Sequence, residues 1–187
     1  MTKTKTTSNK LTLHSSRLVA SILIMLVSAV ALAQRPPPPP LAIPNPNYVT
    51  IDMEIDVNKP AAEVWKRIGK YCDIAEWLPV VRECTMLSGK EGEVGSVRSV
   101  ANEILVGKTE LSYTYTQPVR EGSPYNLYHG TLEARPVDAK TSKIVYTLMY
   151  DNSLVQGDEA AKQAEMDRRR SIFMGAMKKM KELAEAG

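Results

Sequence analysis

The sequence predicts an α+β domain in which an antiparallel sheet curls around one long C-terminal helix. From residue 48 onward, short strand-like runs are separated by turn signals, which favours antiparallel pairing. Residues 157–187 instead form one proline-free run with helical spacing. An antiparallel sheet with one apolar face must cover that face, and a single long helix does so most simply if the sheet curls around it.

Residues 1–33 are predicted to be a secretory signal peptide. Four basic side chains and no acidic one precede or enter an almost wholly apolar run, 18–33, which ends in an A-x-A cleavage pattern. We expect cleavage after Ala33 and a periplasmic or secreted protein. The alternative is an uncleaved anchor, which would be the chain's one association with a membrane. The apolar run is a little short of the ~20 residues of a spanning helix.

The net charge of the chain depends on this leader. It is +3 for all 187 residues and becomes −1 once the four basic residues of 1–33 are removed. The basic balance of the full chain is therefore no evidence for nucleic-acid binding, which needs basic residues clustered on the folded domain. His14 is lost with the leader, so His129 is the one histidine of the mature chain.

A proline-rich segment, residues 34–47, joins the leader to the domain. Its seven prolines exclude a helix interior and favour an extended polyproline II spacer. We interpret it as a stiff tether. The alternative is a ligand for a proline-binding module. The domain itself is expected to span residues 48–187.

Periodicity predicts the first strand and the first helix of the domain. In "YVTIDMEIDV", residues 48–57, apolar and polar residues alternate, which indicates a strand with one buried face. Pro60 then suits the first turn of a helix. The apolar stripe of that helix consists of Ala61, Val64, Trp65 and Ile68. We therefore expect Trp65 in the core.

A second short helix is expected to carry Trp77 and to end before Pro79. From there to residue 152 the sequence is typical of strands. The strand-like runs are 80–87, 96–106, 109–118, 124–137 and 143–152. The final helix has a rough apolar stripe of Met166, Phe173, Met177, Met180 and Ala184. At 1.5 Å per residue such a helix is long enough to lie across a whole sheet.

Two cysteines, Cys72 and Cys84, remain in the mature chain. An exported protein can keep a disulfide, but geometry decides whether one forms. Cys84 lies in a strand-like run, where a small buried thiol is the commoner interpretation. The sequence leaves the bridge open and favours free thiols.

Three phrases resemble a known family: "VNKPAAEVWKRIGKYCDIAEWLPVV", "YHGTLEARPV" and "KIVYTLMYD". With the element order they resemble the SRPBCC superfamily, the START-like or Bet v 1-like helix-grip proteins, and within it the polyketide cyclase/dehydrase branch. The resemblance covers about residues 48–185. It implies a sheet of about seven strands gripping the C-terminal helix, with a deep cavity for hydrophobic or aromatic small molecules or lipids. Some members catalyse ring closure or dehydration, and no universal catalytic motif carries across.

The excess of tyrosine suggests what lines such a cavity. The mature chain has eight Tyr and a single Phe, although a purely apolar core favours Phe. A ligand pocket is mostly apolar with a few directed polar groups. The alternative is that these tyrosines lie on the outer face of the sheet. The predicted cavity residues are Trp77, Tyr113, Tyr115, Tyr128, Tyr146, Tyr150, Phe173 and Met177, with Trp77 at the lip or wall.

The charged residues of the domain are expected outside this cavity. His129 is the obvious acid–base candidate, but strand parity points it outward if Leu132 points inward. Arg98 and Glu103 are expected on a solvated outer face, because unpaired charges are seldom buried. The basic run "DRRR", residues 167–170, is expected on the solvated face of its helix.

No catalytic or cofactor motif is present. The chain has no Cys/His cluster with metal-ligand spacing, no GxGxxG, no GxxxxGK[ST] and no G-x-S-x-G. We expect no metal, no cofactor and no nucleic-acid partner. The first hypothesis is an exported binding protein for a hydrophobic or aromatic small molecule or lipid. The alternatives are a cyclase/dehydrase-like enzyme in which cavity tyrosines and Arg98 polarise a carbonyl, and a tethered interaction domain with a filled core.

Overall fold

The computed structural model describes residues 43–119, 122 and 125–186. The predicted signal peptide and residues 34–42 of the predicted tether lie outside this part of the chain, so their boundaries stay predictions. Within the described residues, no helix is both long enough and apolar enough to cross a bilayer.

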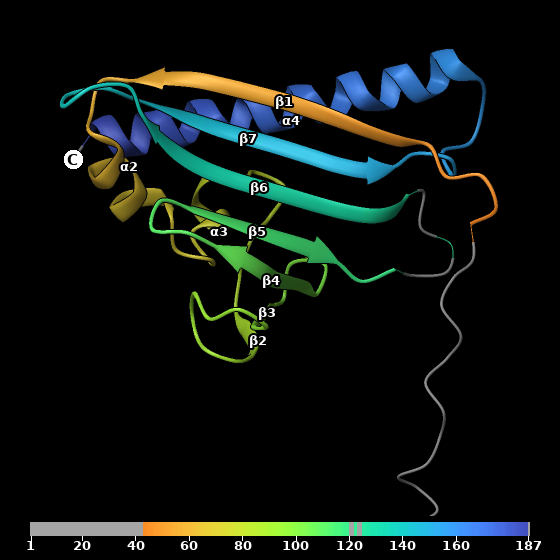
Figure 1. Cartoon of the computed structure of the whole chain (residues 1–187), viewed down its shortest axis with the longest axis horizontal. Coiled ribbons are helices and arrows are strands. Elements are labelled where there is room, and N and C mark those ends of the chain that lie inside the picture. Colours follow the sequence, from red (N-terminus) through yellow and green to blue (C-terminus); the bar gives the residue numbers. More distant parts are fainter. Residues whose placement is uncertain (1–42, 120–121, 123–124, 187) are drawn as a thin grey trace, which may run out of the picture. The chain divides into compact units, whose positions relative to one another are not determined.

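The described strands form one antiparallel sheet of seven strands, in the order β1-β7-β6-β5-β4-β3-β2 (Figure 1). The strands are β1 (Tyr48–Val57), β2 (Met86–Ser88), β3 (Val97–Arg98), β4 (Glu103–Lys108), β5 (Ser112–Gln117), β6 (Asn126–Pro136) and β7 (Ser142–Asp151). The helices are α2 (Ala61–Ile68), α3 (Ile74–Trp77) and α4 (Glu159–Glu185). This arrangement confirms the predicted fold class of a curved sheet, two short helices after the first strand and one long C-terminal helix.

The core lies between the sheet and the long helix. β1 and β7 pair without a register shift from Tyr48↔Asp151 to Val57↔Ser142, so their alternating apolar residues share one face. That face is buried at Ile51 and Met53 of β1, and α4 lies along these strands (Figure 1). The buried residues of α4 are Phe173, Ala176, Met177, Met180 and Ala184, close to the predicted stripe.

The long helix also covers the β1 edge of the sheet. α4 begins where the Asp158 side chain accepts a hydrogen bond from the Ala161 N–H at 3.0 Å, an N-cap arrangement. Further along, Arg170 donates to the Asp52 carbonyl at 2.7 Å and Lys181 donates to the Asp56 carbonyl at 2.8 Å. These bonds satisfy carbonyl groups of β1, one of the two edge strands, which would otherwise lack a strand partner.

Two strand predictions were too long. In the run 80–87 only the end is strand, as the start of β2. The run 96–106 is divided into β3 and β4 by a tight turn in which Ala101 and Asn102 have φ of 49° and 55°. Alternation of apolar residues does not reveal such a turn, because the polar residues within it also fit a strand pattern.

Cys72 and Cys84 form a disulfide, with their Cα atoms 5.3 Å apart. The preference for free thiols in the sequence analysis was therefore wrong. The bridge joins the turn after α2 to the non-strand segment before β2. Sequence spacing could not reveal this proximity, because the intervening helix α3 brings the two segments together.

Candidate functional site

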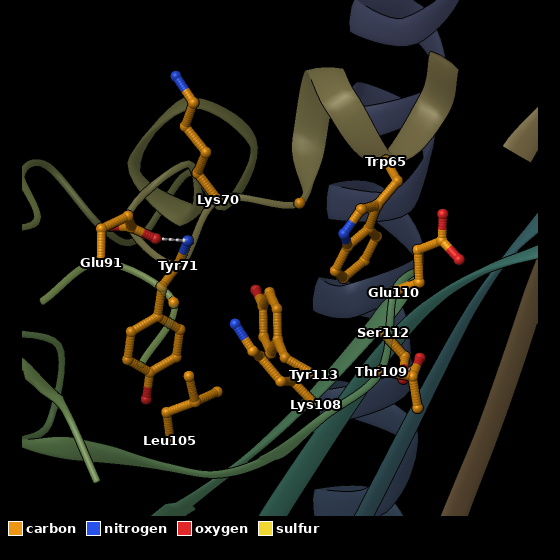
Figure 2. A pocket seen from close by; sticks show the side chains of 12 residues that line it. Trp65, Lys70, Tyr71, Glu91, Leu105, Lys108, Thr109, Glu110, Ser112 and Tyr113 are labelled. Atoms are coloured by element: carbon orange, nitrogen blue, oxygen red, sulfur yellow. Dashed lines mark hydrogen bonds between the residues drawn. The ribbon is translucent and has the colours of Figure 1, made fainter. Parts of the chain in front are cut away.

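A pocket of about 520 Å³ lies between the end of α2, the loop after β2 and the β4–β5 hairpin (Figure 2). Such a volume falls within the usual range of small-molecule sites, ~300–1,000 Å³. The residues that line it are Trp65, Gly69, Lys70, Tyr71, Glu91, Gly92, Leu105, Lys108, Thr109, Glu110, Ser112 and Tyr113. One of the eight cavity residues that the sequence predicts, Tyr113, lines this pocket, and the other seven do not.

Three aromatic rings form its wall. The Tyr113 ring lies 5.6 Å from the Trp65 ring and 5.5 Å from the Tyr71 ring, centroid to centroid. Trp65 was expected in the core, but it is half-buried and lines the pocket. Its indole lies against Gly69, where an added Cβ would come within 2.5 Å of the ring. The glycine that ends α2 therefore makes room for the pocket's tryptophan.

Tyr71 is fixed from two directions. Its backbone N–H donates to the Glu91 carboxylate, which ties the turn after α2 to the loop after β2 (Figure 2). Its carbonyl accepts a hydrogen bond from the Arg98 guanidinium. The next residue, Cys72, is held by the disulfide. This wall of the pocket is therefore positioned before any ligand arrives.

Arg98 and Glu103 are buried, at 0% and 2% exposure, so their predicted place on a solvated outer face was wrong. They oppose each other across the β3–β4 hairpin, and Arg98 Nε donates to Glu103 Oε2 at 2.7 Å. The other Glu103 oxygen accepts from Gln117 at 2.9 Å. Because the opposite charges are paired and hydrogen-bonded, they can be buried together.

This ion pair lies directly behind the aromatic wall. The Arg98 guanidinium carbon is 4.1 Å from the centre of the Tyr71 ring and 4.9 Å from that of Tyr115. At these distances the cation is attracted to the ring faces. Desolvation raises the pKa of Glu103, and the hydrogen bonds from Arg98 and Gln117 oppose that increase.

The Tyr71 and Tyr113 hydroxyls are buried, and neither makes a hydrogen bond of normal geometry within the described part of the chain. Burial raises the pKa of both phenols, although the nearby charge of Arg98 opposes the increase. Both groups therefore stay protonated at neutral pH. Neither hydroxyl is open to solvent, and the Tyr113 phenol interacts with the Arg98 guanidinium behind the wall.

The eight predicted cavity residues are all buried, and the structure brings them together between the sheet and α4. The Tyr146 ring lies 4.8 Å from Phe173 and 6.3 Å from Trp77, centroid to centroid. The Tyr115 and Tyr146 hydroxyls are 3.0 Å apart and hydrogen-bonded. Trp77 is 1% exposed and packs inside this cluster. Their role in lining a ligand cavity stays a prediction.

Tyr128 and Tyr150 of that set surround a second inward cation, Arg169. Its guanidinium carbon is 4.7 Å from the Tyr150 ring centre and 5.3 Å from that of Tyr128. Arg169 donates to Glu165, and the Tyr150 hydroxyl donates to the same carboxylate at 2.6 Å. Burial raises the pKa of Tyr128 to about 12, opposed by Arg169. The predicted solvated face for all of 167–170 was therefore wrong at Arg169.

His129 has the orientation that strand parity predicts. Leu132 is fully buried, and His129, on the opposite face of β6, is half-buried. Burial lowers the pKa of His129. Among the described residues, no three His, Cys, Asp or Glu side chains are grouped as a metal site.

The family profile described as polyketide cyclase/dehydrase and lipid transport matches residues 48–185. The chain belongs to this family. The match begins at the first residue of β1 and ends at the last residue of α4, so it covers the whole helix-grip domain. No curated protein sequence matches the chain significantly.

Solved structures show the same fold at low sequence identity. The protein XoxI from Bacillus cereus superposes with a TM-score of 0.59 at 18% identity, covering 71% of this chain and 93% of its own. The Zhui aromatase/cyclase from Streptomyces sp. R1128 gives 0.56 at 15%, covering 74% and 94%. Ara h 8.0201 gives 0.55 at 14%, covering 75% and 100%. These likenesses place the chain in the SRPBCC, Bet v 1-like fold.

Sequence reasoning missed Trp65, Tyr71 and Lys108 as pocket residues. Trp65 fitted the apolar stripe of α2, and Tyr71 lies in a turn where periodicity is uninformative. One signal was available: Gly69 lies four residues after Trp65, where a missing Cβ leaves space beside a large ring. Nothing in the sequence indicated that Lys108 reaches across to another loop.

Proposed function

We propose that this protein is an exported binding protein for a hydrophobic or aromatic small molecule, which is recognised in the pocket at Trp65, Tyr71 and Tyr113. The observation that carries this proposal is the pocket with its wall of three aromatic rings. Such a wall offers stacking surface, and the polar residues that line the same pocket, such as Lys108, offer hydrogen bonds to a ligand oxygen. Membership of a family whose description includes cyclases and lipid transport agrees with this function.

Export is part of the proposal, and the disulfide supports it. Disulfides persist in oxidising compartments and are rare in the cytosol. The Cys72–Cys84 bridge and the predicted leader are independent of each other, and both support export. The test is to fractionate cells that express the full chain and to measure the intact mass of the protein in each fraction. An exported form beginning at Gln34 is expected. Full-length protein that stays in the cytosol would contradict export.

Native mass spectrometry tests the binding function most directly. The protein is purified from the fraction in which it accumulates and measured before and after solvent extraction. We expect additional mass that disappears on extraction, and its composition identifies an aromatic compound or a lipid. The extracted protein is then titrated with N-phenyl-1-naphthylamine, an uncharged aromatic dye. Absence of both a bound compound and dye binding would contradict the proposal.

Tryptophan fluorescence can test where the ligand binds, because the two tryptophans lie in different places. Trp65 lines the pocket and Trp77 lies in the core, so the variant Trp77→Phe leaves a single tryptophan in the pocket. Dye binding should change the fluorescence of this variant strongly. Trp65→Phe is the matched control, since its remaining tryptophan is far less accessible. A stronger response in the control would place the ligand in the interior cluster instead.

A second candidate is a cyclase/dehydrase-like enzyme, and one observation favours it. Tyr71 and Tyr113 keep their protons at neutral pH and can donate to a carbonyl oxygen, which polarises it. The test is prolonged incubation of the protein with its recovered ligand, followed by mass analysis for loss of water. Conversion that stops in Tyr113→Phe while the ligand still binds would support an enzyme. An unchanged ligand supports a binding protein.

A further inference from the structure

We propose that the pocket selects aromatic ligands that carry a carboxylate or another anionic oxygen, and that Lys108 is the residue that recognises the anion. This inference rests on the proposed binding function and specifies its ligand class. It depends on where the charged groups of the pocket lie and which of them are already paired.

Lys108 crosses the pocket. It is the last residue of β4, and its side chain extends toward the loop after β2, where a Cβ built on Gly92 would lie 3.9 Å from the Lys108 Nζ. In Figure 2 its ammonium lies between the Tyr71 and Tyr113 rings. Among the described residues, no acidic side chain lies within ion-pair distance of Lys108.

The other charges of the pocket do not neutralise this cation. The Glu91 carboxylate is engaged by the Tyr71 N–H. In Figure 2 the Glu110 carboxylate lies on the far side of Trp65 from Lys108, and the Lys70 ammonium points away from the rings. Lys108 is therefore the one cation that the pictured side chains direct into the aromatic space.

The charged group that faces this space is a hydrogen-bond donor. The Lys108 ammonium has three N–H groups and no acceptor. A ligand that satisfies them must bring acceptor oxygens, and a negative charge on those oxygens makes the hydrogen bonds shorter and stronger. The Trp65 and Tyr113 rings offer apolar surface against which an aromatic body can pack, so the ligand class is an aromatic acid.

A pair of matched probes tests this selectivity. The purified protein, freed of bound compounds by solvent extraction, is titrated by calorimetry with 2-naphthoate and with its uncharged analogue 2-naphthamide, which has the same ring system. We expect the acid to bind at least about tenfold more tightly, since a hydrogen bond to a charged group contributes about 1.5–3 kcal/mol. Lys108→Met should weaken the binding of the acid much more than that of the amide and so remove this preference. Lys108→Arg should retain the preference.

Lys90→Met is the control, because Lys90 is an exposed lysine of the neighbouring loop that does not line the pocket. It should bind both probes as the unmodified protein does. Circular dichroism verifies that each variant is folded. Equal binding of the acid and the amide overturns the anion preference but leaves the proposed binding function intact. If neither probe nor the uncharged dye binds, both proposals fail.

Discussion

At the residue scale, the buried ion pair behind the pocket is costly to disturb. Arg98 is fully buried and depends on Glu103 for its neutralisation. Removing one member leaves an uncompensated buried charge, whereas replacing both by apolar residues is much less harmful.

We therefore predict that Arg98→Met lowers the free energy of unfolding by about 3–5 kcal/mol. The double variant Arg98→Met with Glu103→Leu should recover a large part of this loss, because no charge is then left unpaired. Urea denaturation of the two variants measures the difference. Equal losses in the single and the double variant would contradict the argument, since packing around the guanidinium would then dominate.

His129 provides a pH prediction at the same scale. Burial lowers its pKa, so the folded protein binds this proton more weakly than the unfolded chain does. The stabilisation is complete above the unfolded pKa of about 6.5 and is lost as the pH falls through the lower folded value. Relative to His129→Gln, the unmodified protein should therefore lose stability as the pH falls below about 6.5. Parallel stability–pH curves for the two proteins would contradict this.

At the element scale, the β5–β6 pairing depends on a glycine. Gly130 lies opposite Tyr115, and a Cβ at this position would come within 2.3–2.5 Å of the tyrosine ring. The ring cannot move freely, because its hydroxyl bonds to Tyr146 inside the cluster. The absence of a side chain at Gly130 on β6 thus leaves room for the Tyr115 ring on β5.

Gly130→Ala should lower the free energy of unfolding by about 1–3 kcal/mol, the usual cost of overpacking a core. The matched control is Gly107→Ala on β4, where an added Cβ meets no atom within 4 Å. That substitution should change stability by less than ~0.5 kcal/mol. Thermal or urea unfolding of both variants tests the prediction, and similar effects at the two glycines would refute the role of Tyr115.

At the scale of the whole molecule, the Cys72–Cys84 disulfide joins the helical segment after β1 to the residues just before β2, an edge strand of the sheet. That region has short strands, with two residues in β3 and three in β2. A crosslink across a sequence separation of 12 residues restricts the unfolded chain where the fold itself is least regular.

The double variant Cys72→Ala with Cys84→Ala is predicted to be less stable by about 2–3 kcal/mol under oxidising conditions. A reducing agent should lower the stability of the unmodified protein by a similar amount and leave that of the variant unchanged. Denaturation curves with and without reductant provide the measurement. An effect of the reductant on the variant would show that it acts elsewhere.

The sequence by itself determined the main order of elements, the buried face of β1 and the apolar stripe of α4, because periodicity reports which side of an element is apolar. It also determined the family. Only the tertiary structure decided that Arg98 and Glu103 are buried and that Arg169 is mostly covered, because burial of a charge depends on a partner placed opposite it. The same holds for Trp65 and the disulfide, since α2 and the turns bring together groups whose proximity no local pattern records.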